Sequence, residues 1–200
     1  MSGAVDPIKL YAMRFENLYM FSAELKESQN PFYALSSDTR KAIVVLLATK
    51  GPLTLSQIAS ELNLTPPSVL RNLRILMETG LVGIVPETAT RRFKQYYTSV
   101  PYFTSRELNR VLQDLEPIIA GVVERYREGL DRAYTRFLDI AKNENLAVSR
   151  VLSYIDEKKV RLGFFQFFQS TIMRELVKMK AIPLVTELEI PWAGYIVIKD

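Results

Sequence analysis

The sequence of 200 residues contains no cysteine and no histidine. These absences exclude disulfide bonds, thiolate and imidazole metal ligands, and catalysis by a cysteine nucleophile or a histidine base. No stretch approaches the roughly 18 apolar residues of a membrane-spanning helix, and residues 1–10 lack the basic and apolar regions of a secretion signal. Neither a nucleophile–base pair nor a phosphate-binding loop is recognisable. We therefore expect a cytoplasmic protein that is not an enzyme and needs no metal or cofactor.

The positive charge is concentrated in one part of the chain. Hydrophobic residues make up 48% of the sequence and charged residues 24%, which is typical of a globular protein. Residues 35–100 carry 8 basic and 4 acidic side chains, whereas residues 1–34 carry 3 and 4, and residues 101–200 carry 15 and 14. The net charge of +4 therefore arises in the middle third. A bias of this size indicates an anionic partner only where it coincides with a binding motif.

Helical periodicity and capping residues predict a mainly α-helical protein. Thr54 and Gln57 form a capping box before a short helix, and Asn63 tolerates the positive φ of a tight turn. Thr65 caps the next helix, with Pro66 at its first position. The predicted helices span residues 7–28, 38–49, 55–62, 66–79, 104–141 and 146–180.

A change to a period of about two after Gly80 predicts a small β-hairpin. Its strands are Leu81–Val85 and Arg92–Thr98, and Tyr195–Lys199 is a candidate for a last short strand. The expected fold is mainly α with a small β-hairpin: a winged helix-turn-helix domain followed by a helical region. We divide the chain into an N-terminal dimerisation helix, the winged helix-turn-helix domain, and a long helix with a C-terminal helical region, at residues 1–34, 35–100 and 101–200.

Three segments between residues 35 and 99 resemble the ArsR-like winged-helix regulators. LSSDTR at 35–40, followed by Ile43–Leu47, resembles the opening helix of that family. LTLSQIASELNL at 53–64 resembles its positioning helix and turn, and SVLRNLRIL at 68–76 resembles its recognition helix. The resemblance implies a transcription regulator that binds double-stranded DNA as a homodimer.

Metal-sensing members of that family hold cysteine, histidine and carboxylate ligands on the recognition helix or near the terminal helices. Leu70 or Asn72 stands where that helix often carries cysteine or histidine. We therefore expect a regulator that does not sense soft metals.

The predicted recognition helix has two faces. Val69, Leu73 and Leu76 form an inward face, and the opposite face is free to enter a DNA groove. Arginine suits paired contacts to guanine and asparagine suits adenine, so Arg71 and Asn72 are predicted to read bases. The alternative is that Arg71 and Arg74 are ordinary solvated charges. The full predicted DNA-binding set is Thr65, Pro67, Ser68, Arg71, Asn72, Arg74, Arg91, Arg92 and Lys94.

The last three of these residues lie beside the hairpin tip. Long cationic side chains there are predicted to reach the minor groove or its phosphates. Protection of an edge strand is the alternative explanation for Arg91, Arg92 and Lys94. Tyr96 and Tyr97 are expected to pack the wing onto the body rather than to stack on bases.

The long helix carries an apolar stripe that is too long for a domain of about 65 residues to cover. We predict that it pairs with the N-terminal helix in a two-fold dimer, although the chain's own C-terminal helix is a competing partner. The predicted dimer residues are Tyr11, Phe15, Leu18, Leu108, Leu115, Val122 and Leu130. Phe164–Phe168 indicates either a core or dimer contact, or a pocket for an apolar small-molecule effector; attachment to a membrane surface is disfavoured because a lysine-rich face is lacking.

These features predict a homodimeric, sequence-specific regulator whose partner is double-stranded DNA. The alternative is a winged helix that binds other proteins and does not bind DNA.

Overall fold

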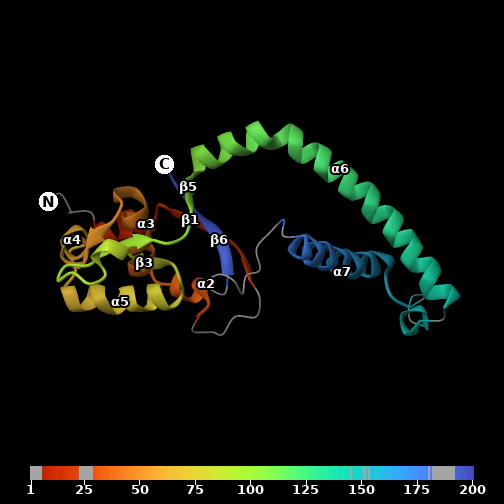
Figure 1. The fold of residues 1–200 in the computed structure, drawn as a ribbon, viewed down its shortest axis with the longest axis horizontal. Coiled ribbons are helices and arrows are strands. Elements are labelled where there is room, and N and C mark those ends of the chain that lie inside the picture. Colours follow the sequence, from red (N-terminus) through yellow and green to blue (C-terminus); the bar gives the residue numbers. More distant parts are fainter. Residues whose placement is uncertain are drawn as a thin grey trace. The chain divides into compact units, whose positions relative to one another are not determined.

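The chain forms two compact units, one made by residues 1–111 with 185–200 and the other by residues 112–184. A computed structural model describes residues 6–22, 29–144, 146–150, 152, 154–179, 181 and 192–200 (Figure 1). Its helices and two small sheets confirm the predicted fold class. No helix in these ranges is long and apolar enough to cross a membrane.

The first unit contains most of the elements. Its helices are α1 (Pro7–Ala12), α2 (Pro31–Ala34), α3 (Asp38–Lys50), α4 (Leu55–Glu61) and α5 (Pro66–Glu78). Its strands are β1 (Phe15–Ser22), β2 (Leu53–Thr54), β3 (Val82–Ile84), β4 (Gln95–Thr98), β5 (Tyr102–Thr104) and β6 (Trp192–Ile198). The order α3, α4, α5, β3, β4 is that of a winged helix-turn-helix, as predicted.

The centre of this unit is α3, which is buried from Ala42 to Ala48. Ile58 of α4 and Leu73 of α5 are each 0% exposed and belong to the same core. The inner face of α5 is therefore fixed by packing, and its outer face is left to solvent. The predicted boundaries of these three helices agree with the structure to within one residue.

The N-terminal helix predicted over residues 7–28 is wrong. Helix α1 ends at Ala12, and β1 follows from Phe15 to Ser22; residues 23–28 lie outside the described residues. The spacing of the apolar side chains fits a helix, but β1 gains inter-strand hydrogen bonds by pairing antiparallel with β6 from Asn17 to Ser22. A long-range pairing of this kind overrides the local helical pattern.

Strand β6 is the central strand of a sheet with the order β1-β6-β5. It lies antiparallel to β1 and parallel to β5. Gly194 permits the close approach to β1, because a Cβ atom there would lie 2.1 Å from the carbonyl oxygen of Tyr19. Tyr19 stacks on Tyr195 with ring centroids 5.1 Å apart. The C-terminal strand was predicted, but its place beside the N-terminal strand was not.

Helix α6 (Ser105–Asn143) begins against this sheet. The Thr104 amide donates to Glu107 Oε2 at 2.8 Å, and the Glu107 amide donates to Thr104 Oγ1 at 3.2 Å, which completes the predicted capping box. The Ser105 hydroxyl contacts Glu16 Oε2, and the Arg106 amide donates to Asp200 Oδ2 at 3.1 Å. Residues from both ends of the chain therefore anchor the start of α6.

The second unit is a pair of antiparallel helices joined by a short 3₁₀ helix. It contains most of α6, the 3₁₀ helix η3 (Ala147–Arg150) and α7 (Glu157–Lys178). The single helix predicted over residues 146–180 is wrong at its start. Asp156 caps α7, since its carboxylate accepts the Lys158 amide at 2.9 Å.

Candidate nucleic-acid interface

The turn between α4 and α5 sets the direction of α5. Thr54 and Gln57 form the predicted capping box at the start of α4. Asn63 has a φ of 51°, and the Leu64 amide donates to the Ala59 carbonyl at 2.9 Å. This closes a tight turn of the kind that separates the two helices of a helix-turn-helix.

An ion pair joins α3 to α4. Lys50 Nζ lies 2.7 Å from Glu61 Oε2. The hydrogen bond to Glu61 raises the pKa of Lys50 above its ordinary value. Lys50 therefore keeps its charge at neutral pH, and its contact with Glu61 links the end of α3 to the end of α4.

Helix α5 has the two faces that its sequence predicts. Val69, Leu73 and Leu76 are each 0% exposed. Arg71 and Arg74 are exposed, lie one turn apart, and make no ion pair with any described residue. Three residues correspond to about 4.5 Å along a helix axis, so both guanidinium groups project from the same outer face.

The start of α5 exposes hydroxyl groups and few amides. Thr65 caps the helix without a side-chain cap hydrogen bond, and Pro66 and Pro67 occupy the first two positions. Proline has no N–H, so Ser68 supplies the first free amide of the helix. Thr65 and Pro67 are exposed and Ser68 is half-buried. An anion at this end would therefore meet the hydroxyl groups of Thr65 and Ser68 and the Ser68 amide.

Asn72 is turned away from this surface. The residue is 8% exposed, and its amide Nδ2 donates to the Ser68 carbonyl at 2.9 Å. A side chain that is buried and bonded within its own helix is not positioned to reach a base edge. In this structure the Asn72 amide is therefore engaged within α5, whereas the Arg71 side chain is exposed.

The wing is the loop from Val85 to Lys94, which joins β3 to β4 in a sheet with the order β2-β4-β3. Thr88 holds it: its hydroxyl donates to the Val85 carbonyl at 2.9 Å and accepts from the Gln95 amide at 3.0 Å. Tyr96 is buried, as predicted. The strand that was predicted to start at Arg92 starts at Gln95 in the structure. The basic residues Arg91, Arg92 and Lys94 therefore lie in the loop.

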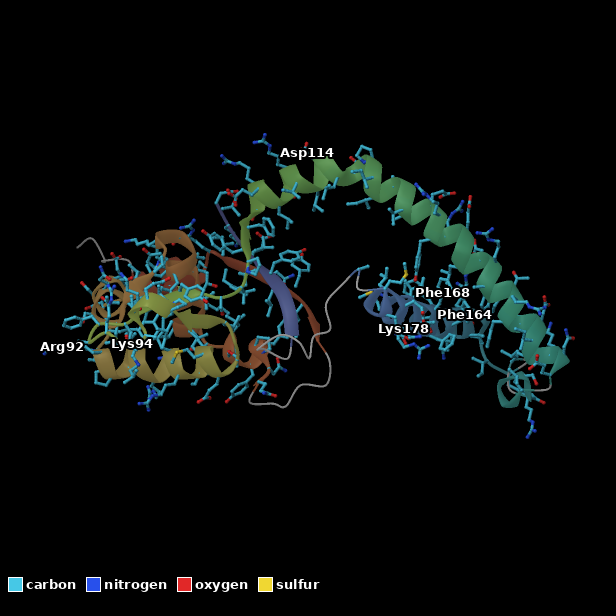
Figure 2. The ribbon with its side chains drawn as sticks, viewed as in Figure 1. Arg92, Lys94, Asp114, Phe164, Phe168 and Lys178 are labelled. Atoms are coloured by element: carbon cyan, nitrogen blue, oxygen red, sulfur yellow. The ribbon has the colours of Figure 1, made fainter. Side chains whose placement is uncertain are left out.

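The three basic residues of the wing are exposed. Arg91, Arg92 and Lys94 make no ion pair with any residue in the described ranges. Figure 2 shows Arg92 and Lys94 on this loop. Together with Arg71 and Arg74 they give five unpaired cationic side chains in the winged helix-turn-helix. This is the local surplus of positive charge that a polyanion requires.

Phe93 was missed by the sequence prediction. It is 66% exposed, and the Arg92 guanidinium lies 5.5 Å from its ring centroid. The sequence feature that could have indicated Phe93 is an aromatic residue flanked by basic residues, in the segment RRFK at 91–94. An exposed ring at the end of a cationic loop offers an apolar surface to a sugar or base.

The predicted dimer residues fall into two groups. Leu18 is buried in the core of its own chain, and Tyr11 and Phe15 pack against that core. On α6, Leu115 and Val122 are 41% and 59% exposed. Leu108 and Leu130 are half-buried. The exposed apolar surface of α6 therefore lies between these last two residues, and the N-terminal residues contribute little to it.

The structure offers no metal centre in its described part, where no group of three or more aspartate or glutamate residues is placed to hold an ion. The outer face of α5 and the wing loop carry cations, hydroxyl groups and one aromatic ring. Side chains of these kinds are suited to contacts with an anion.

Comparison with known proteins identifies the helix-turn-helix. Residues 37–83 match the family model described as bacterial regulatory protein, arsR family. The match confirms the resemblance of these residues to ArsR-like regulators. No curated protein sequence matches this chain.

Solved structures with similarity to the chain include two regulators. An ArsR-like transcriptional regulator from Rhodococcus sp. RHA1 is 27% identical over 52% of this chain and 89% of its own, with a TM-score of 0.31. A zinc-responsive MarR family member from Lactococcus lactis is 19% identical over 62% of this chain and 78% of its own, with a TM-score of 0.26.

Proposed function

We propose that the protein is a cytoplasmic, homodimeric transcription regulator that binds specific sequences in double-stranded DNA. The observation that carries this proposal is the group of five exposed, unpaired basic side chains on α5 and the wing of a winged helix-turn-helix. The match of residues 37–83 to the arsR family of regulatory proteins supports it. The net positive charge of the same part of the chain agrees with a polyanionic partner.

In the proposed complex, α5 enters the major groove. Arg71 reads a base pair, because its planar guanidinium can donate two parallel hydrogen bonds to guanine. Arg74 and the hydroxyl groups of Thr65 and Ser68 bind phosphates and fix the register of the helix. The wing residues contact the adjacent backbone or minor groove, where cations are favoured by the strongly negative potential.

The proposed dimer forms through the exposed segment of α6. Seven large apolar side chains between residues 111 and 123 are at least 40% exposed: Val111, Leu112, Leu115, Ile118, Ile119, Val122 and Val123. Val111, Leu115, Ile118 and Val122 follow spacings of four, three and four, which is the pattern of a two-stranded coiled coil. Because an exposed stripe of this kind is unfavourable in water, we assign it to a second copy of the chain.

Further along α6, aromatic side chains contact α7 of the same chain. Tyr126 contacts Phe168 of α7 with ring centroids 5.7 Å apart, and Tyr134 contacts Phe164 at 5.4 Å. We therefore assign the dimer contact to residues 111–123 and the contact with the C-terminal helix to the part of α6 that follows. We further propose that the second unit binds an apolar small-molecule effector.

A salt titration of DNA binding tests the proposed function. A generic duplex is expected to bind with an affinity that falls steeply as salt increases, and a genomic fragment selected by the protein is expected to bind more tightly. The absence of binding to any duplex at low salt would contradict the proposal. It would favour the second candidate, a winged helix that binds other proteins, for which the exposed Phe93 is the supporting observation.

Substitution of Arg71 by alanine is expected to weaken specific DNA binding by about 1–3 kcal/mol and to relax the preference at one base position in each half-site. Arg71 is exposed on the outer face of α5, so the fold is not expected to change. Binding of the variant to a randomised duplex library measures the preference at each position. Asn72→Ala serves as the control variant, because the Asn72 side chain is hydrogen-bonded within α5. Equal losses on specific and random duplexes would instead assign Arg71 to the DNA backbone.

Zinc, cadmium and arsenite are expected to leave the DNA affinity unchanged at micromolar concentrations. These ions need thiolate or imidazole ligands for tight binding, and the chain has neither cysteine nor histidine. Gel shifts on a selected operator with and without each ion provide the measurement. Release of the protein from its operator by one of the ions would contradict the expectation.

A further inference from the structure

A cleft in the second unit lies between α6 and the start of α7 and has a volume of about 300 Å³. Phe137 of α6 and Phe164 and Phe167 of α7 form much of its lining, and aliphatic side chains complete the apolar wall. The rings of Phe137 and Phe164 lie 5.0 Å apart between centroids. Figure 2 shows Phe164 on α7. This volume is at the lower end of the range for small-molecule sites, about 300–1,000 Å³.

A glycine forms part of the wall of the cleft. Gly163 lies within α7 and lines the cleft. A Cβ atom at this position would meet no atom within 4 Å, so crowding does not explain the glycine. Glycine also destabilises a helix interior relative to alanine. Gly163 is exposed, so a molecule that enters the cleft on this side would meet the backbone of α7 and no side chain at this position.

The described lining of the cleft carries a positive charge and no negative charge. Lys159 is the only titratable side chain among its described lining residues. Its ammonium group is exposed and makes no ion pair with any residue that the structure describes. Arg161, two residues further along, is already engaged, because it contacts Asp131 and lies 5.6 Å from the ring centroid of Tyr134. An apolar cleft with one free cation is complementary to an apolar anion.

We propose that this cleft binds a small organic acid with a flat apolar body. The body lies over Gly163 among the phenylalanine rings, and the carboxylate pairs with the ammonium group of Lys159. This cleft is then the site of the effector proposed for the second unit, and the regulatory role of that effector rests on the proposed function. Binding of the ligand is measured without DNA. The proposed ligand site and the proposed DNA-binding function can therefore be tested independently.

Calorimetric titration of the full-length protein with 2-naphthoate tests the site. We expect one saturable site per chain. Gly163→Leu places a side chain in the open space and is expected to lower the affinity at least about tenfold, whereas Gly163→Ala is expected to stay within about threefold of the unmodified protein. Circular dichroism verifies that both variants keep their helices.

The charge is tested separately. Lys159→Met keeps an apolar stem and is expected to weaken 2-naphthoate binding about tenfold while leaving the binding of 2-naphthol, which is uncharged at neutral pH, unchanged. Lys158→Met is the matched control, because Lys158 is exposed on the same turn but does not line the cleft. Absence of saturable binding at millimolar 2-naphthoate would overturn the proposal. Unaltered binding by Gly163→Leu would overturn it as well, because the ligand would then bind elsewhere.

Discussion

The double substitution Leu115→Glu with Val122→Glu is expected to convert the protein from a dimer to a monomer in solution. It is also expected to lower the affinity for an operator with two half-sites by about 10²–10⁴-fold, because the two winged helices no longer bind as one unit. Both side chains are exposed on α6, at 41% and 59%, so the change does not disturb the core of the chain. Burial in a dimer would stabilise each large apolar side chain by about 1.5–3 kcal/mol before the entropy of association is subtracted. Glutamates facing each other across a two-fold axis replace that gain with repulsion.

Light scattering provides the measurement. The unmodified protein is expected at twice 22.9 kDa at tens of micromolar, and the double variant at 22.9 kDa. Asn109→Glu with Gln113→Glu is the control, since it adds the same charge at exposed polar positions of α6 and is expected to remain dimeric. Binding to a single half-site should be equal in all three proteins. A mass of 22.9 kDa for the unmodified protein would contradict the dimer and leave the stripe to another partner.

The helix-turn-helix was predictable because its signals are local. A capping box at Thr54 and Gln57, a positive φ at Asn63 and a proline after Thr65 each act within a few residues. Such signals fix element boundaries without knowledge of the rest of the chain. The alternation of inner and outer positions along α5 then predicted which arginines are exposed.

The two ends of the chain were not predictable in the same way. Strand β1 exists because it pairs with β6, where Tyr19 lies opposite Tyr195. Residues this far apart leave no shared pattern in a single sequence, so the helical spacing of Tyr11, Phe15 and Leu18 was misleading. Helix α7 began late for a local reason that was overlooked, namely the capping carboxylate of Asp156.

The structure adds two details to the candidate interface that the sequence does not give. A helical wheel places Asn72 near the boundary between the faces of α5, and only the packing decides that its amide bonds to Ser68. Phe93 was overlooked because the aromatic residues of a hairpin are usually buried, and the shortening of β4 exposes this one. Both details depend on the ends and edges of elements, which periodicity defines least well.

Replacement of Arg91, Arg92 and Lys94 by alanine is expected to weaken binding to every duplex by about 10²-fold near physiological salt and to reduce the salt slope by up to roughly three units. Each lysine or arginine that neutralises a phosphate releases about 0.9 counterion from B-DNA, and all three side chains are exposed on the wing. The relative preference among sequences should persist, because α5 is unchanged. The hydrogen bonds of Thr88 and the burial of Tyr96 should keep the wing folded.

Removal of three positive charges also lowers the long-range attraction to DNA, so the control must lose the same charge elsewhere. Three arginines of α6 are exposed and lie outside the proposed DNA interface: Arg110, Arg132 and Arg136. Their replacement by alanine is expected to reduce affinity modestly and to leave the salt slope nearly unchanged, since no phosphate contact is lost. Titration of a fluorescent duplex from 50 to 300 mM salt compares the three proteins. If the wing variant retains the slope of the unmodified protein, the wing does not contact DNA, and its cations then serve to keep the edge of the small sheet from pairing with other strands.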